Sequence, residues 1–167
     1  MWSELRLALS SPEEQLSEAL RRWNANDEEG AIKWARRAAR RNDLAKVVAS
    51  QWLMLRRRGT PEEAEAIALV TQAAQAGLTE AQQVLASYYF HGEGVPRDVR
   101  AAYEWTRKAA DAGNLTCQLT MVEFLSTGEH WEPDIELARH YAELAAAAGH
   151  SEPLAALVQQ YGQELKK

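Results

Sequence analysis

The chain has few of the residues that carry covalent or metal chemistry. Its 167 residues include a single cysteine, Cys117, so no disulfide can form within the chain. The four histidines, His91, His130, His140 and His150, never stand at the i, i+4 spacing of a helical metal site. Neither an HExxH, a CxxC nor a G-x-S-x-G motif occurs. We therefore expect no catalytic residues, no cofactor and no metal.

Long apolar runs are also missing. No run approaches the ~20 consecutive apolar residues that a membrane-spanning helix needs. The first seven residues contain an acid and no long apolar core, so they do not resemble a signal peptide as they stand. We expect a cytoplasmic, monomeric protein that does not bind membranes, and whether a leader has been removed stays open.

Proline is rare, and its placement favours helices. The five prolines stand at positions 12, 61, 96, 133 and 153, each near an expected helix start, where a missing N–H is tolerated. No alternating pattern typical of strands competes with this interpretation. The sequence therefore predicts an all-α protein.

What the chain does have is an internal repeat. Gly77, Gly113 and Gly149 stand 36 residues apart, and each follows a segment rich in alanine, such as Ala109-Ala110-Asp111-Ala112 before Gly113. Three further series keep the same step: the acids Glu62, Asp98 and Asp134, the alanines Ala66, Ala102 and Ala138, and the bulky residues Leu69, Trp105 and Tyr141. A fixed period of this size is typical of a solenoid of stacked helix pairs.

Each repeat predicts a second helix that begins at the acid and ends at the glycine. Ala102, Trp105 and Ala109 recur at i, i+3 and i+7, which is one helical face. The acid suits the helix start, and a left-handed residue after the helix end favours glycine. A degenerate first copy fits with one residue fewer, and there we expect Asn42 to take the glycine's left-handed role. The other repeated positions of this first copy are held by Asp27, Ala31, Trp34, Ala38 and Ala39.

A first helix precedes each of these. Ala45, Ala81 and Cys117 are equivalent positions, and the small residue there predicts close packing of the two helices. Cys117 is therefore interpreted as a buried small hydrophobic residue. In the first copy the helix is predicted to run from Ser11, as N-cap, to about Trp23.

The most regular copy resembles a known family. The pattern Ala81-x3-Leu85-x3-Tyr89-x2-Gly92-x-Gly94-Val95-x2-Asp98-x3-Ala102-x2-Trp105-x2-Lys108-Ala109-Ala110-x2-Gly113 is similar to a Sel1-like repeat (SLR), a relative of the tetratricopeptide repeat. Three features depart from it: Ala86 stands in a usual glycine position, His130 and Trp131 replace Gly and Val of the fourth turn, and the second turn has one glycine only.

The resemblance implies a single right-handed α-solenoid domain of about four antiparallel helix pairs. The repeats are expected at about 11–42, 43–78, 79–114 and 115–150. A capping helix is expected at about 152–165, with Leu154, Leu157, Val158 and Tyr161 packing inward.

By the same resemblance, the first helix of each pair lines a concave groove that binds a protein or peptide. The positions opposite the buried stripe of these helices are the candidate contacts. They are Val47, Gln51, Met54, Gln83, Ser87, Phe90, Leu119 and Glu123. An alternative stays open, in which Val47 and Phe90 pack against the neighbouring repeat. Trp131, in the turn, either overfills its position or projects as a contact.

Charge is unevenly distributed along the chain. Residues 1–58 hold 12 Lys and Arg against 8 acids, whereas residues 59–167 hold 7 against 16. The basic residues gather near expected helix ends, at Arg36, Arg37, Arg40, Arg41, Arg56, Arg57 and Arg58. They form either a solvated face that suits the helix dipole or a contact for an acidic partner. Nucleic acid is the least favoured partner, because the rest of the chain is acidic and no aromatic residues alternate with the arginines.

The predicted function is a non-enzymatic protein–protein interaction module, such as an adaptor, scaffold or chaperone-like binder. An alternative implied by the resemblance is an immunity-type protein that neutralises a toxin or secreted effector. A β-lactam-related enzyme is less favoured, because no nucleophile–base pair is visible in the sequence.

Overall fold

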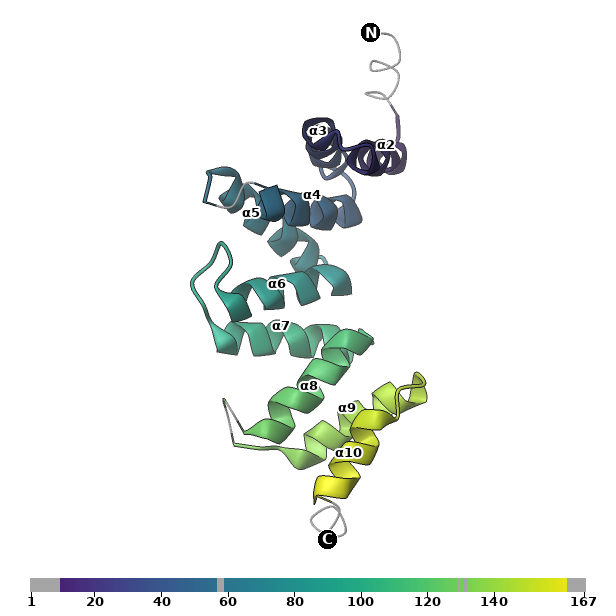
Figure 1. The fold of residues 1–167 in the computed structure, drawn as a ribbon, viewed down its shortest axis with the longest axis vertical. Coiled ribbons are helices and arrows are strands. Elements are labelled where there is room, and N and C mark those ends of the chain that lie inside the picture. The colour runs from purple at the N-terminus through teal and green to yellow at the C-terminus, as the bar shows by residue number, and fades with distance from the viewer. Residues whose placement is uncertain (1–9, 57–58, 129, 131, 162–167) are drawn as a thin grey trace. The chain divides into compact units, whose positions relative to one another are not determined.

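The computed structural model describes residues 10–56, 59–128, 130 and 132–161 (Figure 1). Within these ranges all regular structure is helical, as the sequence predicts. The helices are α2 (Pro12–Asn24), α3 (Glu28–Ala38), α4 (Asp43–Arg56), α5 (Glu62–Gln75), α6 (Thr79–His91), α7 (Val99–Asp111), α8 (Leu115–Thr127), α9 (Ile135–Ala147) and α10 (Glu152–Tyr161).

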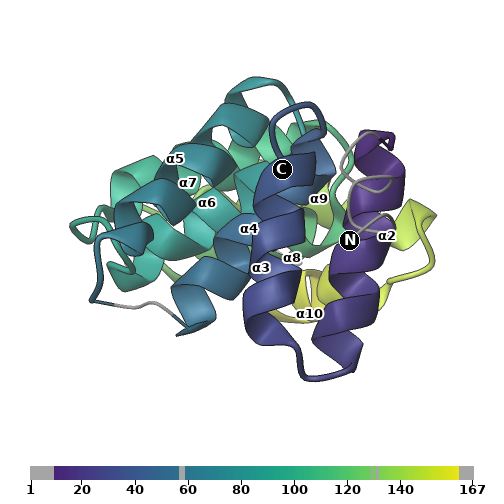
Figure 2. The same cartoon turned by 90° about the horizontal axis from the view of Figure 1, so that it is seen from above.

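The helices belong to two compact units, which are described separately. Unit 1 comprises residues 1–85 and 94–96, and so contains α2 to α5 and the first half of α6. Unit 2 comprises residues 86–93 and 97–167, and contains the rest of α6 and α7 to α10. In unit 1, α3 packs against both α2 and α4 (Figures 1 and 2).

The repeated acids begin helices. The Asp98 carboxylate accepts the N–H of Ala101 at 3.0 Å and thereby caps α7. Asp27 and Asp134 cap α3 and α9 in the same way, also at 3.0 Å. Glu62 instead lies in the first turn of α5, where its negative charge interacts favourably with the free N–H groups of the helix start. The N-cap residue of α5, Pro61, makes no side-chain hydrogen bond to them. At α2, Ser11 and Glu14 form a reciprocal capping box.

The repeated glycines end helices. At Gly113, φ is +92°, its N–H donates to the carbonyl of Ala110 at 3.0 Å, and the N–H of Asn114 donates to the carbonyl of Ala109 at 2.9 Å. This is the Schellman motif, which satisfies carbonyls that the helix leaves free. The same pair of hydrogen bonds recurs at Gly77 and Gly149.

The first copy differs, and the expectation for Asn42 is wrong. Asn26, with φ +59°, is the only described residue other than glycine that has a positive φ. Asn42 instead belongs to the next helix, because its side-chain oxygen accepts the N–H of Ala45 at 2.8 Å. It therefore corresponds to Asn114, which caps α8 through the N–H of Cys117 at 3.0 Å.

A second repeated hydrogen bond connects consecutive helix pairs. In unit 1 the Gln82 side-chain amide donates to the carbonyl of Ala74 at 3.2 Å. In unit 2, 36 residues later, Gln118 donates to the carbonyl of Ala110 at the same distance. Both glutamines are buried, and each binds a carbonyl in the last turn of the preceding helix.

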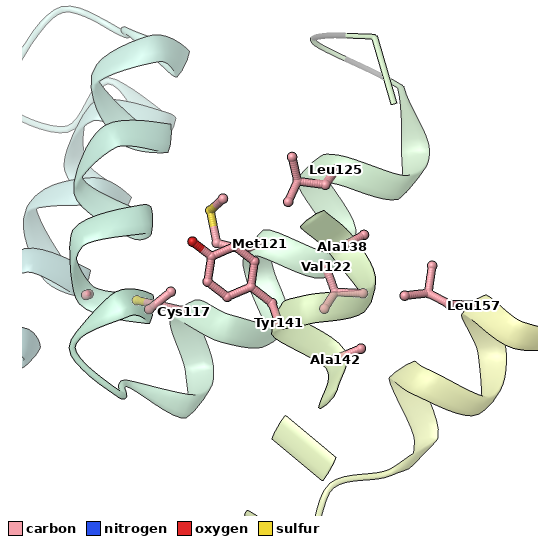
Figure 3. Close-up of a cluster of buried hydrophobic side chains, with 10 residues drawn as sticks. Cys117, Met121, Val122, Leu125, Ala138, Tyr141, Ala142 and Leu157 are labelled. Carbon is pink, nitrogen blue, oxygen red and sulfur yellow. The ribbon is translucent and has the colours of Figure 1, made fainter. Parts of the chain in front are cut away.

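The core of unit 2 gathers around Tyr141, which is 1% exposed (Figure 3). Its ring lies beside Met121, and its hydroxyl donates to Asp111 at 2.7 Å, so that α9 is tied to the end of α7. Burial raises the pKa of Tyr141, and the hydrogen bond to Asp111 raises it further.

Helix α10 covers this core, as the sequence predicts. Leu157 is 3% exposed and points toward Val122, while Leu154 and Tyr161 are half-buried (Figure 3). The Tyr161 hydroxyl donates to the carbonyl of Ser126 at 2.9 Å, which satisfies an end carbonyl of α8. Val158 was expected to pack inward but is 53% exposed, because it lies on the outer side of α10. The expected final residues of this helix, 162–165, lie outside the described residues.

The turn at Gly94 packs on the α4–α5 pair within unit 1. Gly94 has φ +67°, and a Cβ there would lie 2.8 Å from the Met54 methyl carbon, 3.0 Å from Cγ of Glu63 and 3.1 Å from Cδ1 of Ile67. Two constraints therefore require glycine at this position: the left-handed backbone and the lack of space. Gly77 meets only the first, because a Cβ at Gly77 would have no atom within 4 Å.

Replacing both glycines separates these constraints. We expect Gly77→Ala to lower the free energy of unfolding by about 1–2 kcal/mol, the cost of a left-handed alanine. Gly94→Ala should cost about 1–3 kcal/mol more, because the new methyl group also overfills the contact with Met54 and Ile67. Urea unfolding at 25 °C measures both, and equal costs for the two variants would show that the turn does not pack closely on α4 and α5.

Candidate partner-binding surfaces

Two of the predicted groove residues are buried. Val47 is 4% and Met54 is 6% exposed, so neither offers a contact to a partner. Met54 is covered because the Gly94 turn lies against its methyl group. For Val47, burial favours the alternative that it packs within the repeats. A helical wheel assigns both residues to the side of the helix that faces the groove, because the wheel represents one helix alone and leaves out the turns that pack on that helix.

The other predicted groove residues keep some exposure. Gln51, Ser87 and Glu123 are exposed, whereas Gln83, Phe90 and Leu119 are half-buried. Binding at these positions stays a prediction. Trp131 lies outside the described residues, as do Arg57 and Arg58 of the basic series.

Unit 2 brings four aromatic side chains together around Phe90. The ring centroid of Phe90 lies 5.7 Å from that of Phe124 and 6.1 Å from that of His130. Phe124 also lies 6.3 Å from Tyr103 and 6.4 Å from His130. All four are half-buried, and we call them the aromatic cluster. They come from the end of α6, from α7, from α8 and from the turn after α8.

Arg97 joins the edge of the aromatic cluster. Its guanidinium carbon lies 5.6 Å from the centre of the Phe90 ring, and its Nε–H donates to the Phe90 carbonyl at 3.0 Å. The cation therefore stacks over the ring and is held by the backbone at the same time. Burial raises the pKa of Tyr103 above its ordinary value, which is already high enough for the phenol to keep its proton at neutral pH.

The repeat shows that the aromatic cluster is a local elaboration. The positions 36 residues before Phe90, Tyr103 and His130 hold Met54, Ile67 and Gly94, and Gly94 packs closely on the other two in unit 1. At these three positions unit 2 carries rings where unit 1 has two aliphatic side chains and a glycine, whereas the positions 36 and 72 residues before Phe124 are also aromatic, Tyr88 and Trp52. The period was visible in the sequence and could have revealed the cluster.

The turn after α8 has a glycine in the left-handed conformation at Gly128, with φ +66°. Gly128 is the equivalent of Gly92, so the turn keeps its first glycine and has a side chain in place of the second. This change lets the imidazole ring reach Phe90 and Phe124. Phe124 is half-buried and packs against the core of unit 2.

The basic residues of the first half do not form one free surface. Arg36 makes a forked ion pair with Glu65, with Nε 2.9 Å from Oε1, which joins α3 to α5. Arg56 lies 2.7 Å from Glu28 and stacks over Trp23, whose ring lies flat against Trp52 at a centroid distance of 4.4 Å. Both arginines therefore hold helices together. Arg37, Arg40 and Arg41 remain exposed.

A surface hollow of about 310 Å³ opens beside α3. Its lining residues are Glu29, Ile32, Lys33, Arg36, Arg37 and Arg40. Three of these belong to the predicted basic series, whereas Lys33 does not, because as a single lysine it did not stand out in the sequence. The hollow thus has four cationic side chains and one carboxylate.

The described residues show little that could carry out a reaction. No group of three or more His, Cys, Asp or Glu side chains among them could hold a metal ion. Within the same ranges, no helix is both long and apolar enough to cross a membrane. Cys117 is 2% exposed, and burial raises the pKa of its thiol to about 11. This thiol is packed as a small hydrophobic side chain and is not activated as a nucleophile.

The reactivity of Cys117 tests its burial. A thiol with a pKa of about 11 is ionised to roughly one part in a thousand at pH 8, and the native fold also blocks access. We expect iodoacetamide to alkylate the native protein at least about 100-fold more slowly than the protein unfolded in guanidinium chloride. Mass spectrometry of timed samples measures both rates, and equal rates would mean that the thiol is accessible in the native state.

Comparison with known proteins agrees with the repeat. Residues 24–43, 79–114 and 124–150 match the family model of the Sel1 repeat. The crystal structure of a Sel1 repeat protein from Oxalobacter formigenes matches 98% of this chain with a TM-score of 0.79 and 23% sequence identity. The match covers 49% of that protein, so the chain spans about half its length. The structural likeness shows a shared helical repeat fold.

Proposed function

Because this chain belongs to the Sel1 repeat family, whose members are generally protein-interaction modules, we propose that it is a non-enzymatic module that binds a protein or peptide partner. The aromatic cluster of unit 2 is the observation that carries this proposal.

The aromatic cluster has the chemistry of a binding surface. Aromatic side chains are enriched among the residues that dominate binding energy at protein interfaces, because they contribute a large contact area and lose little conformational entropy. Phe90, Tyr103, Phe124 and His130 are half-buried, so each has ring surface left for a partner to cover. Arg97, which stacks over Phe90, adds a polar donor group at the edge.

The fold does not require all of these side chains. At the positions equivalent to Phe90, Tyr103 and His130, unit 1 has Met54, Ile67 and Gly94, none of them aromatic. The rings of Phe90 and His130 are therefore not required by the repeat, whereas Tyr103 and Phe124 also pack against the core of unit 2. A peptide or helix that places apolar side chains against the aromatic cluster fits this surface. Adaptor, chaperone-like and immunity-type roles all use such a contact, and the identity of a co-purifying partner distinguishes them.

The test uses the full chain as bait to identify a co-purifying protein, followed by affinity measurements with the purified pair. We expect His130→Ala and Phe90→Ala each to weaken binding at least about tenfold, because hot-spot residues cost 2 kcal/mol or more when truncated. Leu144→Ala is the matched control, since Leu144 is an exposed apolar residue of unit 2 outside the aromatic cluster. Isothermal titration calorimetry measures each affinity.

His130→Ala is the decisive variant, because His130 lies in a turn and its loss should leave the helices intact. Circular dichroism checks this for both substitutions. If both variants fold and bind as tightly as the Leu144 control, the aromatic cluster is not the binding surface. If Phe90→Ala unfolds the protein, Phe90 is a core residue and the surface must be reassigned.

A further inference from the structure

The hollow beside α3 is lined by a basic stripe. Lys33, Arg36, Arg37 and Arg40 stand at i, i+3, i+4 and i+7, which is the spacing of one helical face. At 1.5 Å per residue the stripe extends over about 10 Å. Ile32 lines the same hollow and is 3% exposed, so it contributes an apolar floor.

The stripe combines fixed and free cations. Arg36 is held by its forked ion pair with Glu65, and the Arg37 guanidinium carbon lies 5.9 Å from the centre of the Trp34 ring. Lys33 is exposed, as is Arg40, and neither side chain makes an ion pair or hydrogen bond with another described residue. Arg36 and Arg37 are therefore held in place before a partner binds, whereas Lys33 and Arg40, at the two ends of the stripe, carry charges that are accessible to a partner.

Helix energetics do not account for the whole stripe. Cations in the last turn of α3 are favoured by the helix dipole, which explains Arg36 and Arg37. Lys33 stands earlier in the helix, where this benefit is lost. It also faces Arg37 at i+4, and Arg36 faces Arg40, which makes two like-charged pairs that Glu29, four residues before Lys33, and Glu65, beside Arg36, offset in part. A face that has more cations than carboxylates and is open to solvent is suited to an oppositely charged partner.

The charges favour an acidic protein segment over a nucleic acid. Carboxylates match the forked donors of arginine. In an extended segment, acids two and four residues apart lie on one face, about 7 and 14 Å apart, and so match a stripe about 10 Å long from Lys33 to Arg40. Nucleic acid fits less well, because no aromatic side chain lines the hollow for base stacking and the chain has a net charge of −5.

We propose that an acidic segment of the protein partner docks along α3, in the hollow between Lys33 and Arg40. This inference rests on the proposed function, because it describes a second contact of the same module. It differs from the aromatic contact in chemistry and in place, since the hollow belongs to unit 1 and the aromatic cluster to unit 2.

The experiment uses the full chain and three fluorescein-labelled probes. The first is a 12-residue peptide of alternating Glu and Leu, the second is its Gln counterpart, and the third is a 12-nucleotide single-stranded DNA. Fluorescence anisotropy at low and high salt measures binding to the wild type. We expect the Glu peptide to bind at least tenfold more tightly than the other two probes, with an affinity that falls as salt rises.

Two double variants test the location. Lys33→Gln/Arg40→Gln should weaken binding of the Glu peptide at least tenfold. Arg100→Gln/Lys108→Gln is the matched control, because it removes one arginine and one lysine charge from exposed residues of unit 2 that do not line the hollow, and it should bind as the wild type does. The unfolding temperature of Lys33→Gln/Arg40→Gln should stay level or rise, since like-charge repulsion is relieved.

Several outcomes would overturn the inference: equal weakening by the two double variants, no preference for the Glu peptide, tighter binding of the DNA, or a fall in unfolding temperature confined to Lys33→Gln/Arg40→Gln. None of these would touch the proposed function, which depends on the His130 and Phe90 variants. Conversely, loss of the aromatic contact with retention of acidic-peptide binding would move the main partner surface to α3.

Discussion

The packing of each helix pair depends on alanines that have no room to be larger. Ala31, Ala66, Ala102 and Ala138 begin the second helices and are at most 1% exposed, and Ala45 and Ala81 of the first helices are wholly buried. Only small side chains stand between neighbouring helices at these positions, with Cys117 at the equivalent of Ala45 and Ala81, so a long side chain would force the helices apart. The aspartate caps, the Schellman turns and the Gln82 and Gln118 hydrogen bonds set where each helix begins and ends, which keeps the alanines in register.

This constraint divides the chain into positions that repeat and positions that are free to differ. Position 94 holds glycine because the turn presses on Met54 and Ile67, yet 36 residues later the same position holds His130. The change is tolerated because Gly128 still supplies the left-handed residue of that turn. The aromatic cluster thus arises by substitution within a fixed frame of helices, without any insertion or new element.

The period and the helix ends could be predicted from sequence because they depend on local chemistry. An aspartate before a helix, a glycine after it and an alanine stripe can each be read within a few residues. The role of Asn42 could not be predicted in this way, because an asparagine between two helices can either end the first helix or cap the second. In the structure it caps α4. Met54 and Val47 were misplaced because their burial comes from contacts outside their own helix. Buried Gln82 and Gln118 look like surface residues until their carbonyl partners are known.

Charges were the least predictable feature, since ion pairs depend on neighbours distant in sequence. Arg36 and Arg37 are alike in the sequence, but Arg36 meets Glu65, which lies 29 residues away on α5. The ion pair with Glu65 neutralises the charge of Arg36 within the basic series, and it also fixes the Arg36 side chain in the wall of the hollow. A carboxylate that approaches the stripe therefore does not have to order the Arg36 side chain, and the entropy cost of docking falls on Lys33 and Arg40 alone. The ion pair that stabilises the fold thus also prepares the surface beside it for an acidic partner.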